Sequence, residues 1–329
     1  MPLPEKSLIA QLRRLASSSR RGKRSPLGTI LTGIGDDCAV LNLASGQDLL
    51  VTTDFSLEGI HFRRDWHPPD SVGHRCLARG LSDIAAMGGT PLAVFLSLAL
   101  PRGLEQSWVN RFFRGLISLA RKHGVTLAGG DTGESPKGVS GDIIVVGSVP
   151  RGKAILRSGA KPRDKIYLSG ELGGSAAAVG KMRAQKKAAE VQARDYPRHF
   201  FPQPRVELGQ MLRERRLATA MIDTSDGLST DLAHICEESD VGAEIESWLV
   251  PRARVGKPPR EVELDLALHG GEDYELLFTA PPGKHIPRHL AGVAITPIGR
   301  ITRGRGILVR NPKGTGYQLD PRGWEHLRS

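Results

Sequence analysis

Aspartates able to bind cations recur along this sequence beside Gly, Ser and Thr. The densest group is the stretch IDTSDGLSTDL, which holds Asp223, Asp226 and Asp231 in a chain whose formal net charge is +11. The other acids of this kind, in GIGDDCAV, VTTDF, GLSDIAAMGG and AGGDTGE, are Asp36, Asp37, Asp54, Asp83 and Asp131. Each one alone is typical of a turn or a helix cap. If they converge, two carboxylates at 4 Å repel by about 4 kcal/mol at an effective dielectric of 20, so the collection predicts bound cations.

The ligand types indicate magnesium and phosphate groups. Oxygen ligands without His or Cys favour Mg²⁺ over zinc. Several Mg²⁺ ions, together with Gly-rich turns whose backbone N–H groups orient oxygens, suit the phosphate chain of a nucleotide. The usual nucleotide motifs fail, because neither GxxxxGK[ST] nor a GxGxxG between strand and helix occurs, and the nearest turn, GELGGSAAAV, lacks the lysine. An ATP site in this chain therefore requires a fold other than those that carry these two motifs.

The composition is that of a globular protein in a reducing compartment. With 329 residues, 39% hydrophobic and 25% charged, the chain is expected to form two domains. The first thirty residues show no secretory signal, and the densest apolar run, Pro91 to Leu100, is about half as long as a membrane span. The three cysteines, Cys38, Cys76 and Cys236, form no CxxC pair, which argues against a disulfide framework and a zinc site. We expect a cytoplasmic protein with no membrane partner.

The basic balance admits two kinds of partner. Lys and Arg number 46 against 35 Asp and Glu, and the pI is near 9.9, which suits either nucleic acid or an anionic small substrate. The basic residues are spread along the chain apart from a cluster at residues 20–24, and an aromatic content of 5% leaves few platforms for stacking bases. We therefore expect anionic metabolites and no nucleic acid.

Strands and helices alternate along the sequence. Apolar spacing predicts a short helix over residues 7–15, a strand over 48–54, a helix over 71–87, a strand over 92–100 and a helix over 106–123 that stops at Gly124. The strand DIIVVGSV follows. A Pro, Arg and Gly-rich stretch then marks a domain boundary, which divides the chain into residues 1–150 and 151–329.

The second half repeats the alternation. KIYLSGELGGSAAAVG reads as a strand, a Gly-rich turn and an Ala-rich helix, and residues 186–204 read as a polar connection. LATAMIDTSDGLSTDLAHICEE reads as a strand, an acidic turn and a helix, and GGEDYELLFTA as a turn running into a strand. IGRITRGRGILV is expected to form a short hairpin.

Seven motifs in this order resemble one family. GIGDDCAVL, TTDFSLEGIHF, LSDIAAMGG, GGDT, RSGAKP, IDTSDGLSTDLAHI and HGGEDYELLFT are similar to those of the thiamine-monophosphate kinases, in the superfamily that includes aminoimidazole ribonucleotide synthetase. The resemblance covers residues from about 7 to 324. It implies an α+β N-terminal domain whose sheets pair across a homodimer into a barrel, and a C-terminal α/β domain. It also implies that residues 1–150 bind ATP and metal and form the dimer, and that ATP phosphorylates thiamine monophosphate to the diphosphate.

The resemblance also implies site residues. The positions that match magnesium ligands are Asp37, Thr52, Thr53, Asp54, Asp83, Asp131, Asp223 and Asp226. The positions that match ATP contacts are Gly130, Asp131, Arg157 and Ser225, and those that line the thiamine phosphate site are His61, Glu272 and Trp324. Phe113 corresponds either to an aromatic residue beside adenine or to a core residue of its helix.

The implied chemistry needs no protein nucleophile. A phosphate monoester has a second pKa near 6, so the attacking oxygen is mostly ionised at neutral pH without a general base. The obstacle is the repulsion between two anions, which Mg²⁺ ions and Arg157 would reduce, while in-line positioning supplies much of the rest. His61 is then a substrate contact or a loop histidine with no role. The alternatives are another enzyme of the same superfamily and a basic nucleic-acid-binding protein that has lost the reaction.

Overall fold

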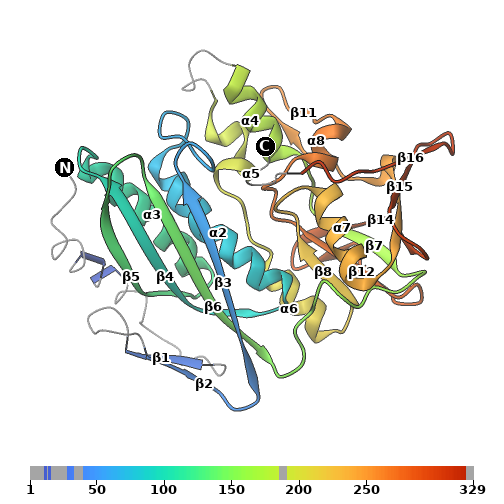
Figure 1. Cartoon of the computed structure of the whole chain (residues 1–329), viewed down its shortest axis with the longest axis horizontal. Coiled ribbons are helices and arrows are strands. Elements are labelled where there is room, and N and C mark those ends of the chain that lie inside the picture. The colour runs from blue at the N-terminus through green and yellow to red at the C-terminus, as the bar shows by residue number, and fades with distance from the viewer. Residues whose placement is uncertain (1–10, 13, 16–27, 33–39, 185–190, 324–329) are drawn as a thin grey trace. The chain divides into compact units, whose positions relative to one another are not determined.

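The computed structural model describes residues 11–12, 14–15, 28–32, 40–184 and 191–323 (Figure 1). The chain divides into two compact units, of which unit 1 comprises Met1–Ile84 and Gly89–Lys153, and unit 2 comprises Ala85–Gly88 and Ala154–Ser329. Asp36, Asp37, Cys38 and Trp324 lie outside the described residues, as does most of the helix expected over 7–15. The roles assigned to residues 1–150 and 151–329 stay predictions.

Unit 1 is built on a sheet whose order, in the described residues, is β3-β6-β4-β5. Its elements are β3 (Gln47–Leu57), α2 (Pro69–Ala86), β4 (Thr90–Pro101), α3 (Gln106–Lys122), β5 (Thr126–Ser135) and β6 (Ser140–Pro150). β4 and β5 run parallel and the other neighbours antiparallel. Two shorter strands, β1 (Gly28–Thr32) and β2 (Val40–Leu43), form a separate pair.

The two faces of this sheet differ in what covers them. Helices α2 and α3 lie against one face (Figure 1), where Ile143 and Val145 of β6 are fully buried. On the other face Ala93, Ala128 and Val146 form a small cluster that Leu41, Phe95 and Ile144 adjoin. Successive residues of a strand point to opposite faces, so each residue of β3 is assigned to one of these two surfaces.

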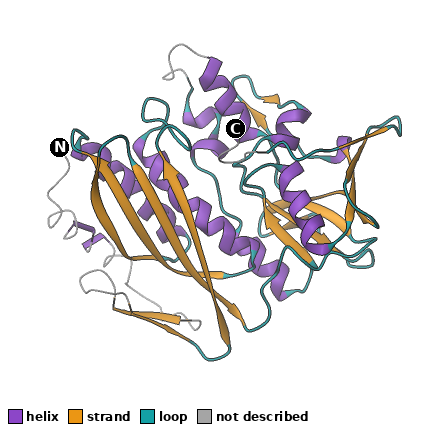
Figure 2. Cartoon of the chain, viewed as in Figure 1, coloured by secondary structure: helices purple, strands orange, loops and turns teal. Residues whose placement is uncertain are grey.

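Unit 2 is built on a mixed sheet (Figure 2), whose order in the described residues is β16-β15-β9-β14-β7-β12-β8. Its strands are β7 (Lys165–Ser169), β8 (Ala220–Asp223), β9 (Gly242–Glu246), β10 (Arg254–Val255), β11 (Arg260–Glu261), β12 (Leu276–Ala280), β13 (His289–Leu290), β14 (Val293–Thr302), β15 (Ile307–Arg310) and β16 (Gly316–Gln318). β10 and β11 pair with each other, and β13 pairs with β14. Its helices are α4 (Gly174–Ala184), α5 (Pro197–Phe200), α6 (Val206–Glu214), α7 (Leu228–Ser239) and α8 (Leu264–His269). Short 3-10 turns occupy Ala193–Asp195 and Ser247–Leu249.

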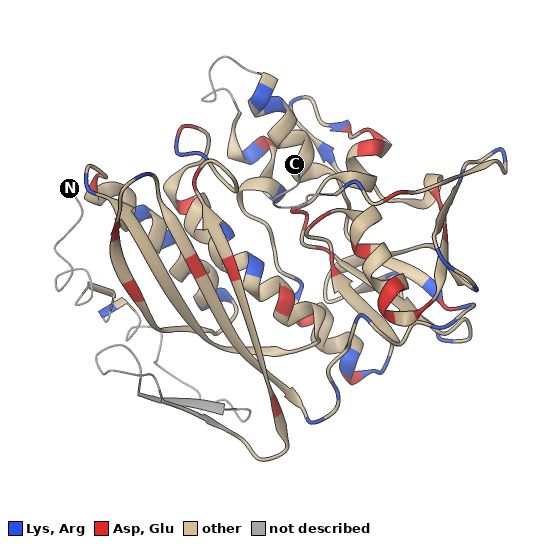
Figure 3. Ribbon diagram, viewed as in Figure 1, with Lys and Arg blue, Asp and Glu red and all other residues tan. Residues whose placement is uncertain are grey.

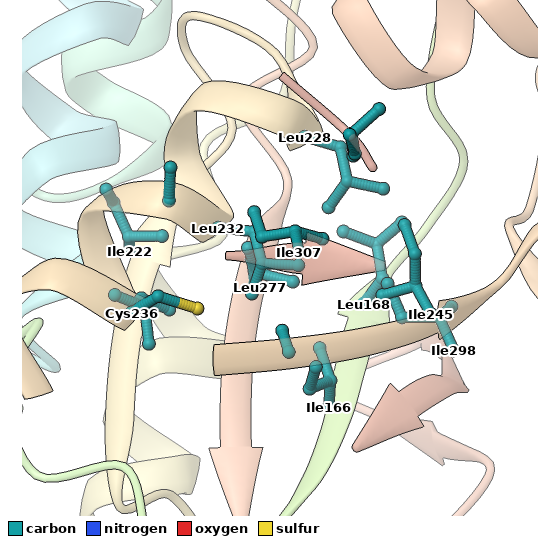
Figure 4. Packing of buried hydrophobic residues seen from close by; sticks show 14 of the residues in the cluster. Ile166, Leu168, Ile222, Leu228, Leu232, Cys236, Ile245, Leu277, Ile298 and Ile307 are labelled. Carbon is teal, nitrogen blue, oxygen red and sulfur yellow. The ribbon is translucent and has the colours of Figure 1, made fainter. Parts of the chain in front are cut away.

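The core of unit 2 lies between α7 and the strands of the sheet (Figure 4). Leu228, Leu232 and Cys236 of α7 pack with Ile222 of β8 and Leu277 of β12. An amphipathic helix beside apolar strands buries its stripe in this way, and each such side chain contributes roughly 1.5–3 kcal/mol. This packing fixes the start of α7, which lies within the acidic stretch IDTSDGLSTDL.

Most elements expected from the sequence are confirmed, with two corrections. Residues 186–204, read as a polar connection, contain the packed helix α5, in which His199 and Phe200 are buried. The expected hairpin of IGRITRGRGILV is wrong, because β9 lies between β14 and β15, antiparallel to the first and parallel to the second. Asp131 of the GGDT stretch lies within a strand, since β5 continues to Ser135 along β4. The position of β9 between β14 and β15 comes from pairing with distant strands, which the local pattern does not contain. Within the described part of the chain, no helix is both long and apolar enough for a membrane span.

Candidate functional site

In unit 1 the structure brings Thr52, Asp54 and Asp83 together. Thr52 and Asp54 lie two apart on β3 and share the face toward α2, which carries Asp83. The Thr52 hydroxyl donates a hydrogen bond to the Asp83 carboxylate. Burial, the charge of Asp83 and a hydrogen bond with it raise the pKa of Asp54 to about 7, against the lowering effect of Arg79. Two carboxyls this close destabilise each other's charged form, and a bound cation would remove that penalty.

The side chains of Asp131 and Thr53 point to the face of the sheet opposite to that of Asp54. The cross-strand register places Asp131 beside Ser97, Ser97 beside Asp142, and Asp142 beside Phe55, whose side chain is 61% exposed. Directly opposed residues point to the same face, so this row faces away from Asp54 and Asp83. Thr53 alternates with Thr52 and is exposed. No described contact joins either side chain to the Asp54–Asp83 pair, and both remain predicted ligands.

Gly130 precedes Asp131 in β5 where the backbone leaves no room for a side chain. Its φ is +146°, and an added Cβ would lie 2.0 Å from the carbonyl oxygen of Leu96. Asp131 is exposed, and its carboxylate accepts the N–H of Thr132 at 2.8 Å. A glycine here brings the two backbones of β4 and β5 into close approach, and the role of Gly130 in ATP binding stays a prediction.

His61 lies in the turn that follows β3. Its ring Nδ1 accepts a hydrogen bond from the Leu57 backbone N–H at 3.0 Å, and the backbone N–H of His61 donates to the Leu57 carbonyl at 2.9 Å. Glu58 fixes the same turn by accepting from Arg64 at 2.6 Å and from the Val139 N–H at 2.8 Å. Because Nδ1 accepts, the neutral imidazole carries its proton on Nε2 and acts as a donor there. This geometry suits a ligand contact better than proton abstraction.

In unit 2 a second acidic group surrounds the start of α7. Asp223 ends β8, Ser225 and Asp226 lie in the loop, and Asp231 is in the first turn of the helix. Asp231 is 1% exposed and accepts the Gly227 N–H at 3.0 Å, which holds the loop against the helix. Burial, then Asp223 and then Asp226 raise the pKa of Asp231 well above its usual value. The carboxyls of Asp223 and Asp226 are therefore each close enough to repel that of Asp231.

Glu272 lies next to this loop. Its N–H donates to the Ser225 carbonyl at 2.8 Å. An added Cβ at Gly271 would lie 2.4 Å from the same carbonyl oxygen, so only glycine permits this approach. One backbone hydrogen bond thus joins a residue expected to bind ATP to a residue expected to bind the acceptor.

The other predicted residues are placed individually. Arg157 has an exposed side chain, and its carbonyl accepts the Ser239 hydroxyl at 3.2 Å. Phe113 is 2% exposed and packs edge-on against Phe112 at 5.4 Å between ring centroids, so it is a core residue of α3. Among the described residues Lys and Arg are spread over helices and loops of both units (Figure 3), as the sequence indicated.

The donor set fits magnesium. Among the residues that the structure describes, no three or more His, Cys, Asp or Glu are grouped so as to hold a metal. Mg²⁺ is usually bound by one or two carboxylates together with phosphate oxygens and waters, and does not need an all-protein cage. The Asp54–Asp83 pair in unit 1 and Asp223 with Asp226 in unit 2 each offer such a partial set.

The sequence missed several polar residues around these groups. In the sequence Asp231 is distinguished only as a member of an acidic cluster, although an acid four residues after Gly227 at the start of a helix is able to contact the preceding loop. Asp273 and Glu275 belong to the HGGEDYELLFT motif without a role of their own, and Asp142 belongs to none of the acidic motifs. Their partners are distant in sequence, so no local pattern identifies them.

Comparisons with known proteins agree on one family. Residues 35–149 match the AIR synthase related protein N-terminal domain, and residues 161–313 match its C-terminal domain. A thiamine-monophosphate kinase of Escherichia coli strain K12 is 40% identical over 303 residues, which cover 90% of this chain and 91% of that protein. The crystal structure of thiamine-monophosphate kinase from Stenotrophomonas maltophilia K279a is 36% identical with a TM-score of 0.78, covering 94% and 97% of the two chains.

A third similar structure is described as AaThiL complexed with AMPPCP and TMP. It is 28% identical with a TM-score of 0.73, and the match covers 99% of this chain and 100% of that one. The two matched domains agree with the two units and their mixed sheets. On its sequence and its fold, this chain belongs to the thiamine-monophosphate kinases, which are phosphotransferases with the two-domain fold of the AIR synthase related proteins.

Proposed function

We propose that this protein transfers the γ-phosphoryl group of ATP to thiamine monophosphate and so forms thiamine diphosphate and ADP. Relatives at up to 40% identity over nine-tenths of the chain bear the name of this activity, and a similar structure is complexed with AMPPCP and TMP. The observation that carries the proposal is the Asp54–Asp83 pair, in which the neighbouring carboxyl helps to raise the pKa of Asp54 to about 7 and Asp83 accepts a hydrogen bond from Thr52, as suits a site for a cation.

The predicted roles follow the family positions. We assign magnesium binding to Asp37, Thr52, Thr53, Asp54, Asp83, Asp131, Asp223 and Asp226. We assign ATP binding to Gly130, Asp131, Arg157 and Ser225, and acceptor binding to His61, Glu272 and Trp324. Residues 1–150 are then the ATP-binding, metal-binding and dimer-forming domain.

The chemistry is a direct in-line transfer. An ionised phosphate oxygen of the acceptor attacks the γ-phosphorus, the bond between that phosphorus and the β,γ-bridging oxygen breaks, and ADP leaves with the electron pair. Bound Mg²⁺ ions would neutralise the charge of the two phosphate groups. The protein holds the reactants in line, and Arg157 adds a positive charge. No side chain has to remove a proton, because the acceptor oxygen is already mostly ionised at neutral pH.

His61 and Glu272 suit the acceptor side. With Nδ1 accepting from the Leu57 backbone at 3.0 Å, His61 presents an Nε2–H donor that is able to hydrogen-bond a phosphate oxygen. Glu272 brings a carboxylate next to the Ser225 loop, where it is able to accept from the amino group of the thiamine pyrimidine. Both roles concern binding and orientation.

We also propose that unit 1 forms a homodimer through the outer face of β3. Leu49, Val51 and Phe55 alternate along this strand and are 51%, 58% and 61% exposed. In the described residues β3 pairs with β6 alone and lies at the edge of its sheet. A row of exposed apolar side chains on an edge strand is a surface that a second sheet covers in a stable protein. This face fits the barrel that the family resemblance implies.

The dimer is tested by light scattering after gel filtration. Val51→Asp should shift the protein from dimer to monomer, whereas Tyr317→Asp, which changes an exposed aromatic residue of unit 2, should leave the dimer intact. A wild-type monomer at micromolar concentration would contradict the proposal. The cytoplasmic location and the lack of nucleic-acid and membrane partners stay predictions.

The activity is tested with purified protein, ATP, Mg²⁺ and thiamine monophosphate. We expect equal amounts of thiamine diphosphate and ADP. No product with this acceptor, together with turnover of a ribonucleotide amidine, would transfer the protein to the aminoimidazole ribonucleotide synthetase reaction. Nucleic-acid binding that falls steeply with salt, without either turnover, would favour a binding protein instead.

A further inference from the structure

The five residues 271–275 have an unusual backbone. Glu272 and Tyr274 have φ values of +64° and +52°, in the left-handed region that residues other than glycine rarely adopt. β12 begins only at Leu276, so regular strand pairing does not hold this segment. Such a conformation at two non-glycine residues that are separated by a single residue is stable only where the surrounding structure fixes it.

Asp273 is fixed by the N-terminus of α4. Its side chain is 4% exposed, and its two carboxyl oxygens accept the Gly173 N–H at 2.6 Å and the Ser175 N–H at 3.1 Å. The Ser175 hydroxyl is in turn 2.8 Å from Nδ1 of His199. Backbone N–H groups at a helix start favour an anion. In this Gly-rich turn a carboxyl group of the protein itself therefore accepts the N–H groups at the start of the helix, where other nucleotide folds bind a phosphate.

Glu275 holds the other end of the segment. It is 1% exposed and accepts from the Ser169 hydroxyl at 2.6 Å, from Arg198 at 2.8 Å and from Nε of Arg205 at 2.7 Å. The Ser169 hydroxyl also accepts the Leu276 N–H at 2.8 Å. Asp273 and Glu275 thus point toward the 169–175 turn from either side of Tyr274.

The segment is joined to the acidic loop through its backbone. The Glu272 N–H donates to the Ser225 carbonyl at 2.8 Å, and the Tyr274 N–H donates to the Thr224 carbonyl at 3.0 Å. In return the Thr224 N–H donates to the Glu275 carbonyl at 2.8 Å, and the Thr224 hydroxyl accepts the Glu275 N–H at 3.0 Å. A displacement of the 271–275 segment must therefore displace Ser225 as well.

We propose that Asp273 is a positioning residue, which from the N-terminus of α4 holds Glu272 and the Ser225 loop in their working conformation. The proposal rests on the proposed function for the identity of the acceptor, thiamine monophosphate, and adds a residue to that site. Asp273 is 4% exposed, and both of its carboxyl oxygens accept N–H groups of the protein. It acts through Glu272, because the two hydrogen bonds to α4 oppose relaxation of the left-handed backbone on either side of it.

The test compares Asp273→Asn with a matched control. An asparagine has one acceptor oxygen where two N–H groups need one each, so one of the two bonds is lost. The control is Asp164→Asn, since Asp164 is also 4% exposed, accepts a backbone N–H from Lys161 at 3.1 Å and accepts the Thr219 hydroxyl at 2.7 Å. Asp164 precedes β7, whereas the 169–175 turn follows that strand.

Two readouts separate positioning from simple stability. Asp273→Asn should raise the KM for thiamine monophosphate about tenfold and speed amide hydrogen exchange in residues 223–227 and 271–275. Asp164→Asn should lower the Tm to a similar extent and leave that KM and that exchange as in the wild type. Equal effects of the two variants on KM and exchange would overturn the proposal.

The exchange measurement separates this proposal from the proposed function. If wild-type protein does not phosphorylate thiamine monophosphate, the function is wrong, while faster exchange confined to the two segments of Asp273→Asn still supports the positioning role. If Asp273→Asn does not fold, Thr224→Val takes its place, because it removes the hydroxyl that accepts the Glu275 N–H. It should produce the same local exchange pattern, and unchanged exchange would count against the proposal.

Discussion

Two acids, Asp54 in unit 1 and Glu275 in unit 2, have opposite kinds of neighbours. In unit 1 Asp54 lies against a second carboxyl, that of Asp83, and its pKa rises to about 7 by burial and by this neighbour. In unit 2 Glu275 lies against two arginines and a serine, each within 2.8 Å. The first arrangement is unfavourable without a cation, and the second is complete as it stands.

This difference offers a rule for assigning roles to acids in an acidic motif. An acid whose partners are donors from the protein stabilises the fold, and an acid whose neighbours are other acids is suited to an ion from solution. Asp231 has both kinds of neighbour. It accepts the Gly227 N–H, and burial together with the charges of Asp223 and Asp226 raises its pKa. It therefore supports the loop on which the two predicted ligands lie.

The largest effect is expected for Asp226→Asn. The change removes a predicted metal ligand and a carboxylate that repels Asp231, so turnover should fall by orders of magnitude, roughly 1,000-fold, while the Tm stays equal or rises. Steady-state kinetics and thermal unfolding measure both. The control is Asp240→Asn, an exposed acid paired with the exposed Arg305 at 3.1 Å, which should change neither quantity. Unchanged turnover of Asp226→Asn at limiting Mg²⁺ would remove Asp226 from the ligands.

Glu275→Gln should act on stability instead. It leaves Arg198 and Arg205 without their shared buried carboxylate, and the free energy of unfolding in urea should fall by about 2–4 kcal/mol, less than for fully buried pairs because the arginines are 30% and 19% exposed. Glu244 is the matched control, since it also binds two arginines, which are 62% and 40% exposed. Glu244→Gln should cost under about 1 kcal/mol. Equal losses for the two variants would remove the distinction between buried and exposed pairs.

Asp273 should make stability depend on pH. Burial raises its pKa from 3.8 to about 7, so between these values the folded state keeps a proton that the unfolded state has lost. The free energy of unfolding should therefore fall as the pH rises from about 4 to about 7, by roughly 1–3 kcal/mol relative to Asp273→Asn, which does not titrate. Urea unfolding of both proteins across this range measures the difference. The raised pKa is contradicted if the difference in free energy of unfolding between the two proteins is constant with pH, or if it increases in favour of the wild type as the pH rises.

The smallest effect is expected for Thr52→Val. The change removes the hydroxyl that donates to Asp83 and is a predicted ligand, while Asp54 and Asp83 remain. The Mg²⁺ concentration for half-maximal rate should rise about two- to five-fold, as expected for loss of one neutral hydrogen-bonding group. Thr52→Ser, which keeps the hydroxyl, should restore the wild-type value. If Thr52→Val matches the wild type at every Mg²⁺ concentration, Thr52 has no part in the site.

Local patterns in the sequence predicted most of the elements and the acidic motifs. The apolar spacing of residues 71–87 and 106–123 corresponds to α2 and α3, and Gly124, with φ +65°, ends α3 as expected. The motif order identified the family, because several short acidic and Gly-rich stretches at fixed positions are far more specific than any single one. These features depend on residues that are close together in the sequence, so a single sequence is enough to predict them.

The remaining features depend on pairing between distant segments. The sequence did not show that β9 separates β14 from β15, nor that the register with Ser97 turns Asp131 away from Asp54. It did not show either that Asp273 reaches the start of α4, one hundred residues earlier. A shift of one residue in strand register moves a side chain to the opposite face, so such placements follow only from the folded chain.

The most direct test is a crystal structure with Mg²⁺, a non-hydrolysable ATP analogue and thiamine monophosphate bound. The account predicts Mg²⁺ ions in contact with carboxylates from both acidic groups, Asp54 with Asp83 and Asp223 with Asp226, and with the phosphates of the nucleotide. Phosphates and metal ions bound elsewhere, with these four carboxylates in contact with protein and water alone, would contradict it.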